Sequence, residues 1–277
     1  MTEDQPFKVC RKPELQNSSL VIGWDEDAGS LGSKIIDYLN DKLGGQEFAE
    51  IEPTGFFQLG GVSVQGDIAQ FPESKFYYCQ DKNLVMFKST PPRAEWYRFL
   101  NSILDVAENY CNVKELYTIG GMVALNAHTS PRELLAIGNS PEMADVLKQF
   151  GLLKNIDHET PPGQRPTLNS FLSWLAKKRN IRGANIWASV PVYLLSTEDP
   201  QSWRKIIDFF DRKLSLGIDF TDLDREIARQ NGKIAQARSQ YPELDGYIHK
   251  LESNFTLTEE EGRELAKEMD DFLRENG

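Results

Sequence analysis

The sequence predicts an α/β fold of three layers, in which helices cover both faces of a mainly parallel or mixed sheet, followed by a C-terminal helical tail. Two observations support this prediction. Up to residue 217, short runs of β-branched and aromatic residues alternate with amphipathic helical patterns, which is typical of a sheet with crossover helices. After residue 217, helical periodicity continues without a strand pattern. We therefore expect an α/β domain over residues 1–217 and a helical segment over residues 218–277.

The first half of the α/β region shows clear strand and helix patterns. After a polar arm, residues 19–24 (SLVIGW) form an apolar run, and residues 31–43 carry apolar side chains at helical spacing until a pair of glycines ends the helix. Residues 46–53 (QEFAEIEP) predict the second strand. Residues 75–80 and 83–89 are rich in aromatic and apolar residues and are separated by a short polar turn, which predicts a β-hairpin.

The second half of the α/β region continues the alternation. Its predicted elements are, in order, a helix over residues 96–107, a strand over 113–121, a strand over 132–140, a helix from 141, a helix over 166–180, a strand over 181–195 and a helix from 200. Ser140-Pro141 and Asp199-Pro200 mark two of the helix starts. A serine or aspartate can cap free N–H groups there, and proline at the first helical position loses no hydrogen bond.

The tail over residues 218–277 shows two apolar stripes at helical spacing. One stripe contains Leu244, Ile248 and Leu251, and the other lies within residues 265–273. A helix with one apolar face has to bury that face against another surface. The tail is therefore expected to pack on the α/β domain or on a neighbouring molecule, and Leu244, Ile248 and Leu251 are candidate interface residues.

The charge balance excludes two classes of partner. The chain has 31 basic and 42 acidic residues, a formal net charge of -11, and such a surface repels nucleic acid and anionic lipid. No basic patch counters it, and no apolar run approaches the ~20 residues needed to span a bilayer. We expect neither a nucleic acid nor a membrane as partner.

Cysteine and histidine usage indicates the compartment and argues against metal chemistry. Cys10, Cys79 and Cys111 are widely spaced, and three thiols cannot pair completely, which indicates a reduced, cytoplasmic setting. The three histidines do not lie near a cysteine, so no metal site is expected. We find no nucleophile elbow and no cofactor motif, and therefore predict no catalytic residue and no cofactor.

The turn between the first strand and the first helix is a candidate ligand site. Gly29-Ser-Leu-Gly32 supplies only the last part of the dinucleotide fingerprint G-x-G-x-x-G, and Asp27 stands where its first glycine should be. Asp25, Glu26 and Asp27 would repel a bound phosphate, because two like unit charges ~4 Å apart repel each other by ~4 kcal/mol at an effective dielectric constant of about 20. We favour a structural corner; the alternatives are a metal or cationic ligand site and a nucleotide cradle.

A second group of residues suggests a crevice at the ends of the strands. Gly120 and Gly121 close a predicted strand, at the kind of edge where open α/β sheets bind ligands. A polar loop follows them, and an arginine after the predicted hairpin could clamp an anion. The candidate crevice comprises Asp25, Asp27, Arg93, Gly120, Gly121, Asn126 and His128. The alternatives are that Arg93 pairs with an acid on the surface and that the loop is an ordinary polar connection.

The segment from Gly55 to Phe71 is a candidate adhesive surface. It is rich in glycine and poor in helix formers, which predicts a long excursion from the sheet. Aromatic and apolar side chains contribute much of the binding energy at protein interfaces. The candidate interface residues here are Phe56, Phe57, Leu59, Val62 and Val64. The alternative is that they fold back onto the parent domain.

Three stretches in this order resemble a known family. They are GWDEDAGSLGSKIIDYL at residues 23–39, LYTIGGM at residues 116–122, and RPTLNSFLSWLAKKRNIRGANIWASVPVYL at residues 165–194, which the Asp-Pro helix start follows. Their order and spacing resemble the proteasome assembly chaperone family, in the branch of the type-two subunit with its archaeal and bacterial relatives. The resemblance covers residues 20–220.

The resemblance implies a fold similar to purine nucleoside phosphorylases, often with a C-terminal helical segment. It further implies self-association, with a trimer favoured, and a protein client such as the proteasome core ring. One departure is that the chain ends in FLRENG and lacks the hydrophobic-tyrosine tail with which some of these chaperones dock. We therefore expect a non-enzymatic, self-associating protein. The alternative is an enzyme or binding protein for a nucleoside or another small metabolite in the strand-end crevice.

Overall fold

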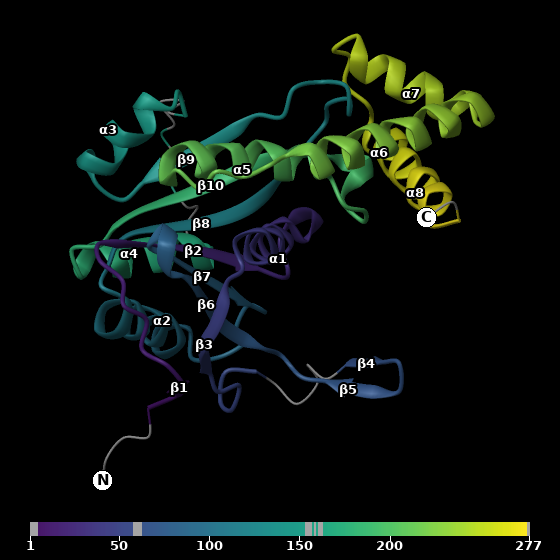
Figure 1. Ribbon diagram of the computed structural model, residues 1–277. Coiled ribbons are helices and arrows are strands. Elements are labelled where there is room, and N and C mark those ends of the chain that lie inside the picture. Colours follow the sequence, from purple (N-terminus) through teal and green to yellow (C-terminus); the bar gives the residue numbers. More distant parts are fainter. Residues whose placement is uncertain (1–4, 58–62, 153–156, 158, 160–162, 276–277) are drawn as a thin grey trace. The chain divides into compact units, whose positions relative to one another are not determined.

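The computed structural model of the protein describes residues 5–57, 63–152, 157, 159 and 163–275 (Figure 1). The chain divides into two compact units. The first unit is built from residues 1–26, 32–119 and 135–186, and the second from residues 27–31, 120–134 and 187–277. Strands β8 and β10 begin in the first unit and end in the second.

The central element is an eight-stranded mixed sheet with the order β1-β3-β6-β7-β2-β8-β10-β9. The strands are β1 (Phe7–Val9), β2 (Ser18–Trp24), β3 (Gln46–Ile51), β6 (Ser74–Cys79), β7 (Leu84–Ser89), β8 (Val113–Ala124), β9 (Leu134–Gly138) and β10 (Arg182–Pro191). Strand β2 is parallel to both β7 and β8. The β6–β7 hairpin, β3–β6 and β1–β3 are antiparallel. The predicted α/β fold with a mixed sheet is confirmed.

Helices of the first unit cover both faces of its part of the sheet (Figure 1). They are α1 (Leu31–Leu43), α2 (Trp96–Cys111), α3 (Pro141–Gln149) and α4 (Leu168–Lys178). Ile22 of β2 belongs to one core cluster with buried side chains of α2 and α4. The next residue, Gly23, lies directly against α1. Because successive residues of a strand point to opposite faces, α1 lies on the face opposite to α2 and α4.

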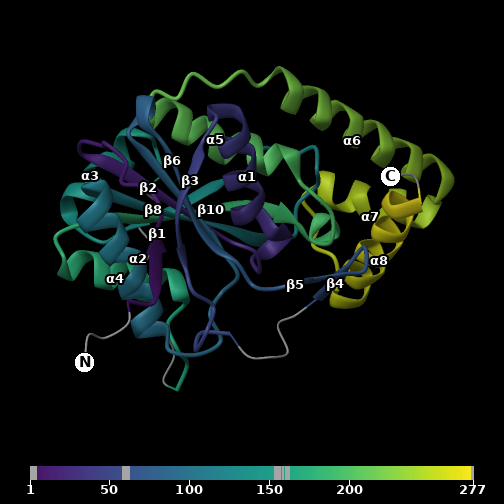
Figure 2. The same ribbon diagram turned by 60° about the horizontal axis from the view of Figure 1, so that its bottom comes forward.

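The segment between β3 and β6 leaves the sheet and forms a separate two-stranded hairpin. Strands β4 (Ser63–Gln65) and β5 (Ile68–Gln70) pair only with each other among the described strands. Gly66 and Asp67 form the turn, with φ of 56° and 64°, as expected of a two-residue hairpin turn with two left-handed residues. Both views show this hairpin projecting away from the sheet of its unit (Figures 1 and 2).

Two of the residues predicted to form an adhesive surface are instead part of the core. Phe56 is fully buried, with its ring centroid 5.0 Å from that of Phe99 on α2. Phe57 is partly buried and packs on the same ring at 6.0 Å. The expectation that they are exposed was wrong, because a ring of α2 is available to cover them. Val64 is 72% exposed, as predicted, whereas Leu59 and Val62 lie outside the described residues.

The second unit contains the helix predicted from residue 200, α5 (Pro200–Leu214), and the helices of the predicted C-terminal tail. The tail helices are α6 (Thr221–Gln240), α7 (Pro242–Glu252) and α8 (Glu259–Glu275). Leu244, Ile248 and Leu251 of α7 are buried, and α7 packs against α6 and α8. These three residues therefore belong to the core of the helical tail, and the prediction that they form an intermolecular interface is corrected. The apolar face of α7 is buried against helices of the same chain.

The helix starts predicted from local sequence are confirmed. The Ser140 hydroxyl accepts a hydrogen bond from the Met143 N–H at 3.3 Å. The Asp199 carboxylate accepts one from the Ser202 N–H at 3.4 Å.

None of the helices in the described part of the chain is long and apolar enough to cross a bilayer.

Candidate functional site

The corner between β2 and α1 depends on a close contact between two glycines. A Cβ atom on Gly23 would lie 2.1 Å from the carbonyl oxygen of Gly32, and one on Gly32 would lie 2.8 Å from the Trp24 nitrogen. Neither distance is compatible with a side chain. Gly32 of the partial fingerprint therefore serves the packing of the helix on the strand, a role that glycine also has in dinucleotide-binding folds.

Each acidic residue of this corner has a partner within the protein. In the first unit, Asp25 Oδ2 accepts a hydrogen bond from the Thr90 hydroxyl at 3.1 Å, and Glu26 forms an ion pair with Arg93 at 2.6 Å. In the second unit, Asp27 Oδ2 accepts from the Gly121 N–H at 2.9 Å. Arg93 is half-exposed in this ion pair, so it adopts the surface role that was the alternative to an anion clamp.

The two glycines expected at a strand end lie inside strand β8. A Cβ on Gly120 would be 2.8 Å from the Trp187 ring, and one on Gly121 would be 2.1 Å from the Ala28 carbonyl oxygen. The strand continues past them to Ala124. The prediction of a strand end was wrong because these glycines accommodate neighbouring groups rather than a turn.

His128 lies in a buried polar contact of the second unit. The Tyr193 hydroxyl accepts a hydrogen bond from the His128 backbone N–H at 2.5 Å and lies 2.9 Å from His128 Nδ1. Burial, followed by the positive charge of Arg238, lowers the pKa of His128 to about 4. The ring is therefore neutral at physiological pH, and its Nδ1 atom shares a hydrogen bond with the Tyr193 hydroxyl.

The loop that carries Asn126 and His128 is anchored by a buried ion pair that the sequence did not indicate. Arg132 Nε and Nη2 donate to the two carboxylate oxygens of Asp199 at 2.8 and 3.1 Å, and both side chains are 1% exposed. Arg132 Nη1 also donates to the carbonyl oxygens of His128 and Ser130. The Ser202 hydroxyl donates to Asp199 Oδ2 at 2.5 Å. The pair thus joins the loop to the start of α5.

These contacts give no support to the enzymatic alternative. Arg93 is bound to Glu26, and the neutral, buried His128 is bound to Tyr193. The Asn126 Oδ1 atom is buried without a hydrogen-bond partner in the described part of the chain. The predicted crevice residues are divided between the two units, and each charged or imidazole group among them has a partner in its own unit.

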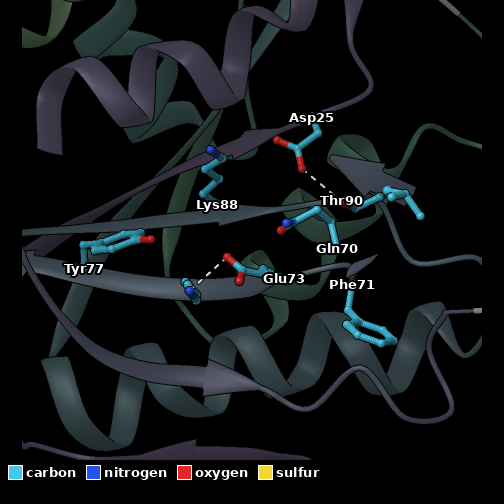
Figure 3. Close-up of a pocket in the computed structure, with 9 residues that line it drawn as sticks. Asp25, Gln70, Phe71, Glu73, Tyr77, Lys88 and Thr90 are labelled. Carbon is cyan, nitrogen blue, oxygen red and sulfur yellow. Dashed lines mark hydrogen bonds and ion pairs between the residues drawn. The ribbon is translucent and has the colours of Figure 1, made fainter. Parts of the chain in front are cut away.

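One predicted residue, Asp25, lines a pocket in the first unit (Figure 3). The pocket has a volume of about 570 Å³. Its walls come from the end of β2, from β6 and β7, and from the β4–β5 hairpin. The lining residues are Asp25, Val64, Gln70, Phe71, Glu73, Lys75, Tyr77, Lys88 and Thr90. Sequence reasoning assigned Lys75, Tyr77 and Lys88 only to strands, and did not place them at a site.

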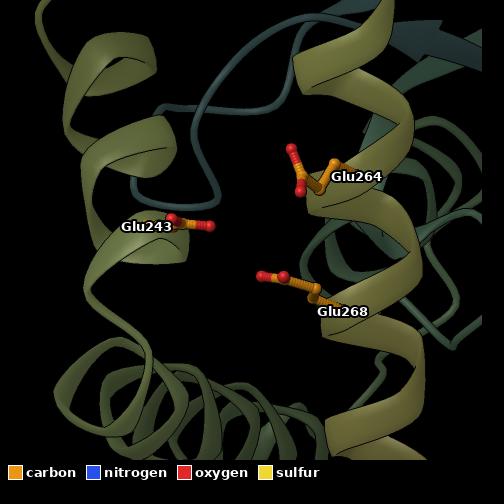
Figure 4. Close-up of side chains that lie close together, drawn as sticks. All are labelled: Glu243, Glu264 and Glu268. Atoms are coloured by element: carbon orange, nitrogen blue, oxygen red, sulfur yellow. The ribbon is translucent and has the colours of Figure 1, made fainter.

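Three carboxylates gather in the helical tail, where no site was predicted (Figure 4). Oxygen atoms of Glu243, Glu264 and Glu268 lie within 4.8 Å of one another. Burial and the nearby charge of Glu264 raise the pKa of Glu268, and the Tyr247 hydroxyl donates to Glu264 at 2.7 Å. Carboxylate oxygens are the ligands that calcium and magnesium prefer.

Replacing Glu268 by glutamine is expected to stabilise the protein slightly at neutral pH. The raised pKa means that the folded state binds a proton more readily than the unfolded state, so ionised Glu268 opposes folding at pH 7 and this penalty disappears as the pH falls. A like-charge pair one helical turn apart costs about 0.2–0.5 kcal/mol, which corresponds to a Tm shift of about 1 °C. Differential scanning calorimetry at neutral and mildly acidic pH measures the gain.

The exposed residue Asp271 on the same helix provides the control. Asp271→Asn should leave the melting temperature nearly unchanged at both pH values. A loss of stability in Glu268→Gln at neutral pH, or a gain that does not shrink on acidification, would contradict the assigned repulsion.

The fold is that of an α/β protein with a mixed eight-stranded sheet and a C-terminal helical segment. The charged residues of the candidate site form contacts with other residues of the chain. The sequence matches the PAC2 family over residues 20–238, and the chain belongs to this family. The proteasome assembly chaperone family expected from the sequence is thereby confirmed. No protein with a curated description matches the sequence.

Solved structures share the fold at low sequence identity. A proteasome-assembly chaperone homologue from Mycobacterium tuberculosis is 19% identical with a TM-score of 0.69, over 83% of this chain and 99% of that chain. A second M. tuberculosis protein, of unknown function, is 18% identical with a TM-score of 0.78, over 92% of both chains. PbaB, an archaeal proteasome activator from Pyrococcus furiosus, is 18% identical with a TM-score of 0.68, over 84% and 98%.

Proposed function

We propose that this protein is a non-enzymatic, self-associating protein that acts through protein–protein contacts, in the manner of proteasome assembly chaperones. Membership of the PAC2 family supports the proposal. Two proteins of similar fold are described as a proteasome-assembly chaperone homologue and as a proteasome activator, and both descriptions name another protein assembly as the target.

The β4–β5 hairpin is the observation on which the proposal rests. Val64 is 72%, Ile68 65% and Phe71 64% exposed. A two-stranded hairpin is at best marginally stable by itself in water, and its exposed apolar side chains are candidates for contact with another molecule. The register pairs Val64 with Ala69 and Gln65 with Ile68, so Val64 and Ile68 lie on opposite faces of the hairpin. The stretch from residue 63 to 71 carries only one charged residue, Asp67. It therefore offers a contact with a single charge on a chain whose net charge of -11 otherwise opposes self-association.

The end of strand β8 offers a second apolar contact, which carries no charge. Met122, Val123 and Leu125 are exposed, and residues 120–127 carry no charge. Two different apolar surfaces on one chain suit head-to-tail contacts, which close into rings when the rotation between subunits permits. This is compatible with the trimer that the family resemblance favours. The proposal further includes a protein client and a cytoplasmic location, where the free thiols of Cys10, Cys79 and Cys111 would stay reduced.

Light scattering coupled to size-exclusion chromatography tests self-association directly. The full-length chain is expected to elute as an oligomer at micromolar concentration, and a Val64→Ser, Ile68→Ser, Phe71→Ser variant to shift towards the monomer. Loss of three apolar anchors should weaken association at least about tenfold, or about 1.4 kcal/mol. The melting temperature should change little, since all three side chains are largely exposed.

Tyr97 provides the matched control, because it is a large exposed side chain on α2 of the same unit. Tyr97→Ser should leave the oligomer intact. A wild-type chain that is strictly monomeric at micromolar concentration would refute self-association. The protein client is tested separately, by affinity purification from the native organism followed by mass spectrometry of the co-purified proteins.

A further inference from the structure

We propose that the pocket between the β4–β5 hairpin and strands β6 and β7 binds a free amino acid as its zwitterion, with an apolar side chain. This goes beyond protein–protein contact, and it does not depend on self-association. The pocket volume of about 570 Å³ falls in the range of small-molecule sites, which combine apolar walls with a few convergent polar groups. All lining residues belong to the first unit.

Two lysines stand directly opposite each other in this pocket. The β6–β7 register pairs Lys75 with Lys88, and both side chains line the pocket. Like charges at directly opposed positions destabilise a sheet. Proteins tolerate such locally unfavourable pairs of residues mainly at functional sites. Asp37 pairs with Lys88, and Glu73 and Glu47 pair with Lys75. A ligand carboxylate between the two ammonium groups would add to this compensation.

Each lysine retains capacity for such a ligand. Lys88 Nζ contacts the two oxygens of Asp37 at 2.9 and 2.7 Å, and Lys75 Nζ lies 2.9 Å from Glu73 and 3.7 Å from Glu47. An ammonium group has three donors, so each lysine has at least one donor beyond these contacts. The side chains of Lys75 and Lys88 are 26% and 31% exposed, which leaves them accessible from the pocket.

The acidic residues of the lining select a zwitterion over a simple anion. Among the lining residues Asp25 and Glu73 balance Lys75 and Lys88. Asp37 and Glu47, which pair with the two lysines from outside the lining, add two negative charges. The hydrogen bond from Thr90 occupies one oxygen of Asp25. A carboxylate has about four acceptor positions on its two oxygens, so Asp25 can also accept from an ammonium group. An α-amino acid carries one group of each sign.

The remaining walls suit an apolar side chain. Val64 and Phe71 come from the hairpin and the residue after it, and the Tyr77 ring comes from β6. Figure 3 shows Gln70 at the end of β5 and Phe71 directly after it, with Tyr77 and Lys88 on strands of the sheet and Asp25 in the turn that follows β2. The hairpin therefore contributes the apolar part of the pocket, and the sheet contributes most of the charged part.

Calorimetric titration of the full-length chain with three matched probes tests the proposal. L-phenylalanine carries both charges, 3-phenylpropionate lacks the amine, and 2-phenylethylamine lacks the carboxylate. L-phenylalanine is expected to bind at a single site with Kd below about 1 mM, and each truncated probe at least about tenfold more weakly.

Two variants test which residue binds the carboxylate of the ligand and which binds its ammonium group. Lys88→Met should weaken L-phenylalanine and 3-phenylpropionate without affecting 2-phenylethylamine. Asp25→Asn should weaken L-phenylalanine and 2-phenylethylamine without affecting 3-phenylpropionate. Lys114→Met is the control, because Lys114 is exposed on β8 and does not line the pocket. Melting curves confirm that each variant is folded, and Lys75→Met replaces Lys88→Met if the latter is not.

Three results would overturn the proposal. They are the absence of saturable binding by L-phenylalanine, equal binding of either truncated probe, and L-phenylalanine binding that neither Lys88→Met nor Asp25→Asn weakens. Val64 and Phe71 take part in both proposals, so the pocket is tested with the Lys88 and Asp25 variants and not with the hairpin variant. Failure of self-association would leave these binding results unchanged.

Discussion

Replacing Gly23 by alanine is expected to destabilise the protein by about 3 kcal/mol or more, near the upper end of the usual cost of overpacking. The added Cβ would lie 2.1 Å from the Gly32 carbonyl oxygen and 2.4 Å from its carbon. Both are backbone atoms of α1, so they cannot move without displacing the helix from the sheet. At about 2–4 °C per kcal/mol, the melting temperature should fall by roughly 6–12 °C.

Gly246 on α7 provides the control for this substitution. A Cβ there would meet no atom within 4 Å, and alanine is the better helix former. Gly246→Ala should leave the melting temperature unchanged or raise it slightly. If Gly23→Ala has the melting temperature of the wild type, helix α1 does not approach β2 at Gly23 and Gly32 as the structure shows.

Replacing Arg132 by methionine is expected to cost about 3–5 kcal/mol, because it leaves the Asp199 carboxylate buried without its counter-ion. Both side chains of the pair are 1% exposed, so water cannot take over the lost hydrogen bonds. The Asp199 carboxylate would keep its hydrogen bonds from the Ser202 hydroxyl and N–H. Urea unfolding measures the change in the free energy of unfolding.

A double-mutant cycle separates the ion pair from the packing of its side chains. Arg132→Met combined with Asp199→Leu should cost less than the sum of the two single changes, because no buried charge is left alone. Arg229→Met, which removes an exposed pair with Glu226, should change stability little. Additive losses in the cycle would show that Arg132 and Asp199 do not act as a pair.

Local sequence patterns were sufficient for most of the elements. The apolar run of residues 19–24 lies within β2, and the two runs around residues 81–82 became the β6–β7 hairpin. The caps at Ser140 and Asp199 were also predicted correctly. These features depend on residues that are near one another in the chain, so the sequence contains their physical cause.

The pocket itself was not predicted from the sequence. Asp25 was recognised, but as part of a crevice with other residues, and Lys75 and Lys88 were assigned only to strands. Their pairing depends on register, which the hairpin turn determines. Cys79 pairs with Leu84 next to the turn, and the same register brings Lys75 opposite Lys88. The predicted runs 75–80 and 83–89 leave a two-residue turn, which implies this register. They do not indicate the hairpin residues that complete the pocket.

The sequence by itself determined the alternation of strands and helices, the helix caps and the helical tail, because each follows from contacts within a few residues. Only the tertiary structure decided which apolar residues are buried. Phe56 and Val64 belong to one glycine-rich segment, yet Phe56 is covered by Phe99 and Val64 is exposed. The apolar stripe of α7 was covered by α6 and α8 in the same way. Burial depends on partners that are distant in the chain, and no local pattern specifies them.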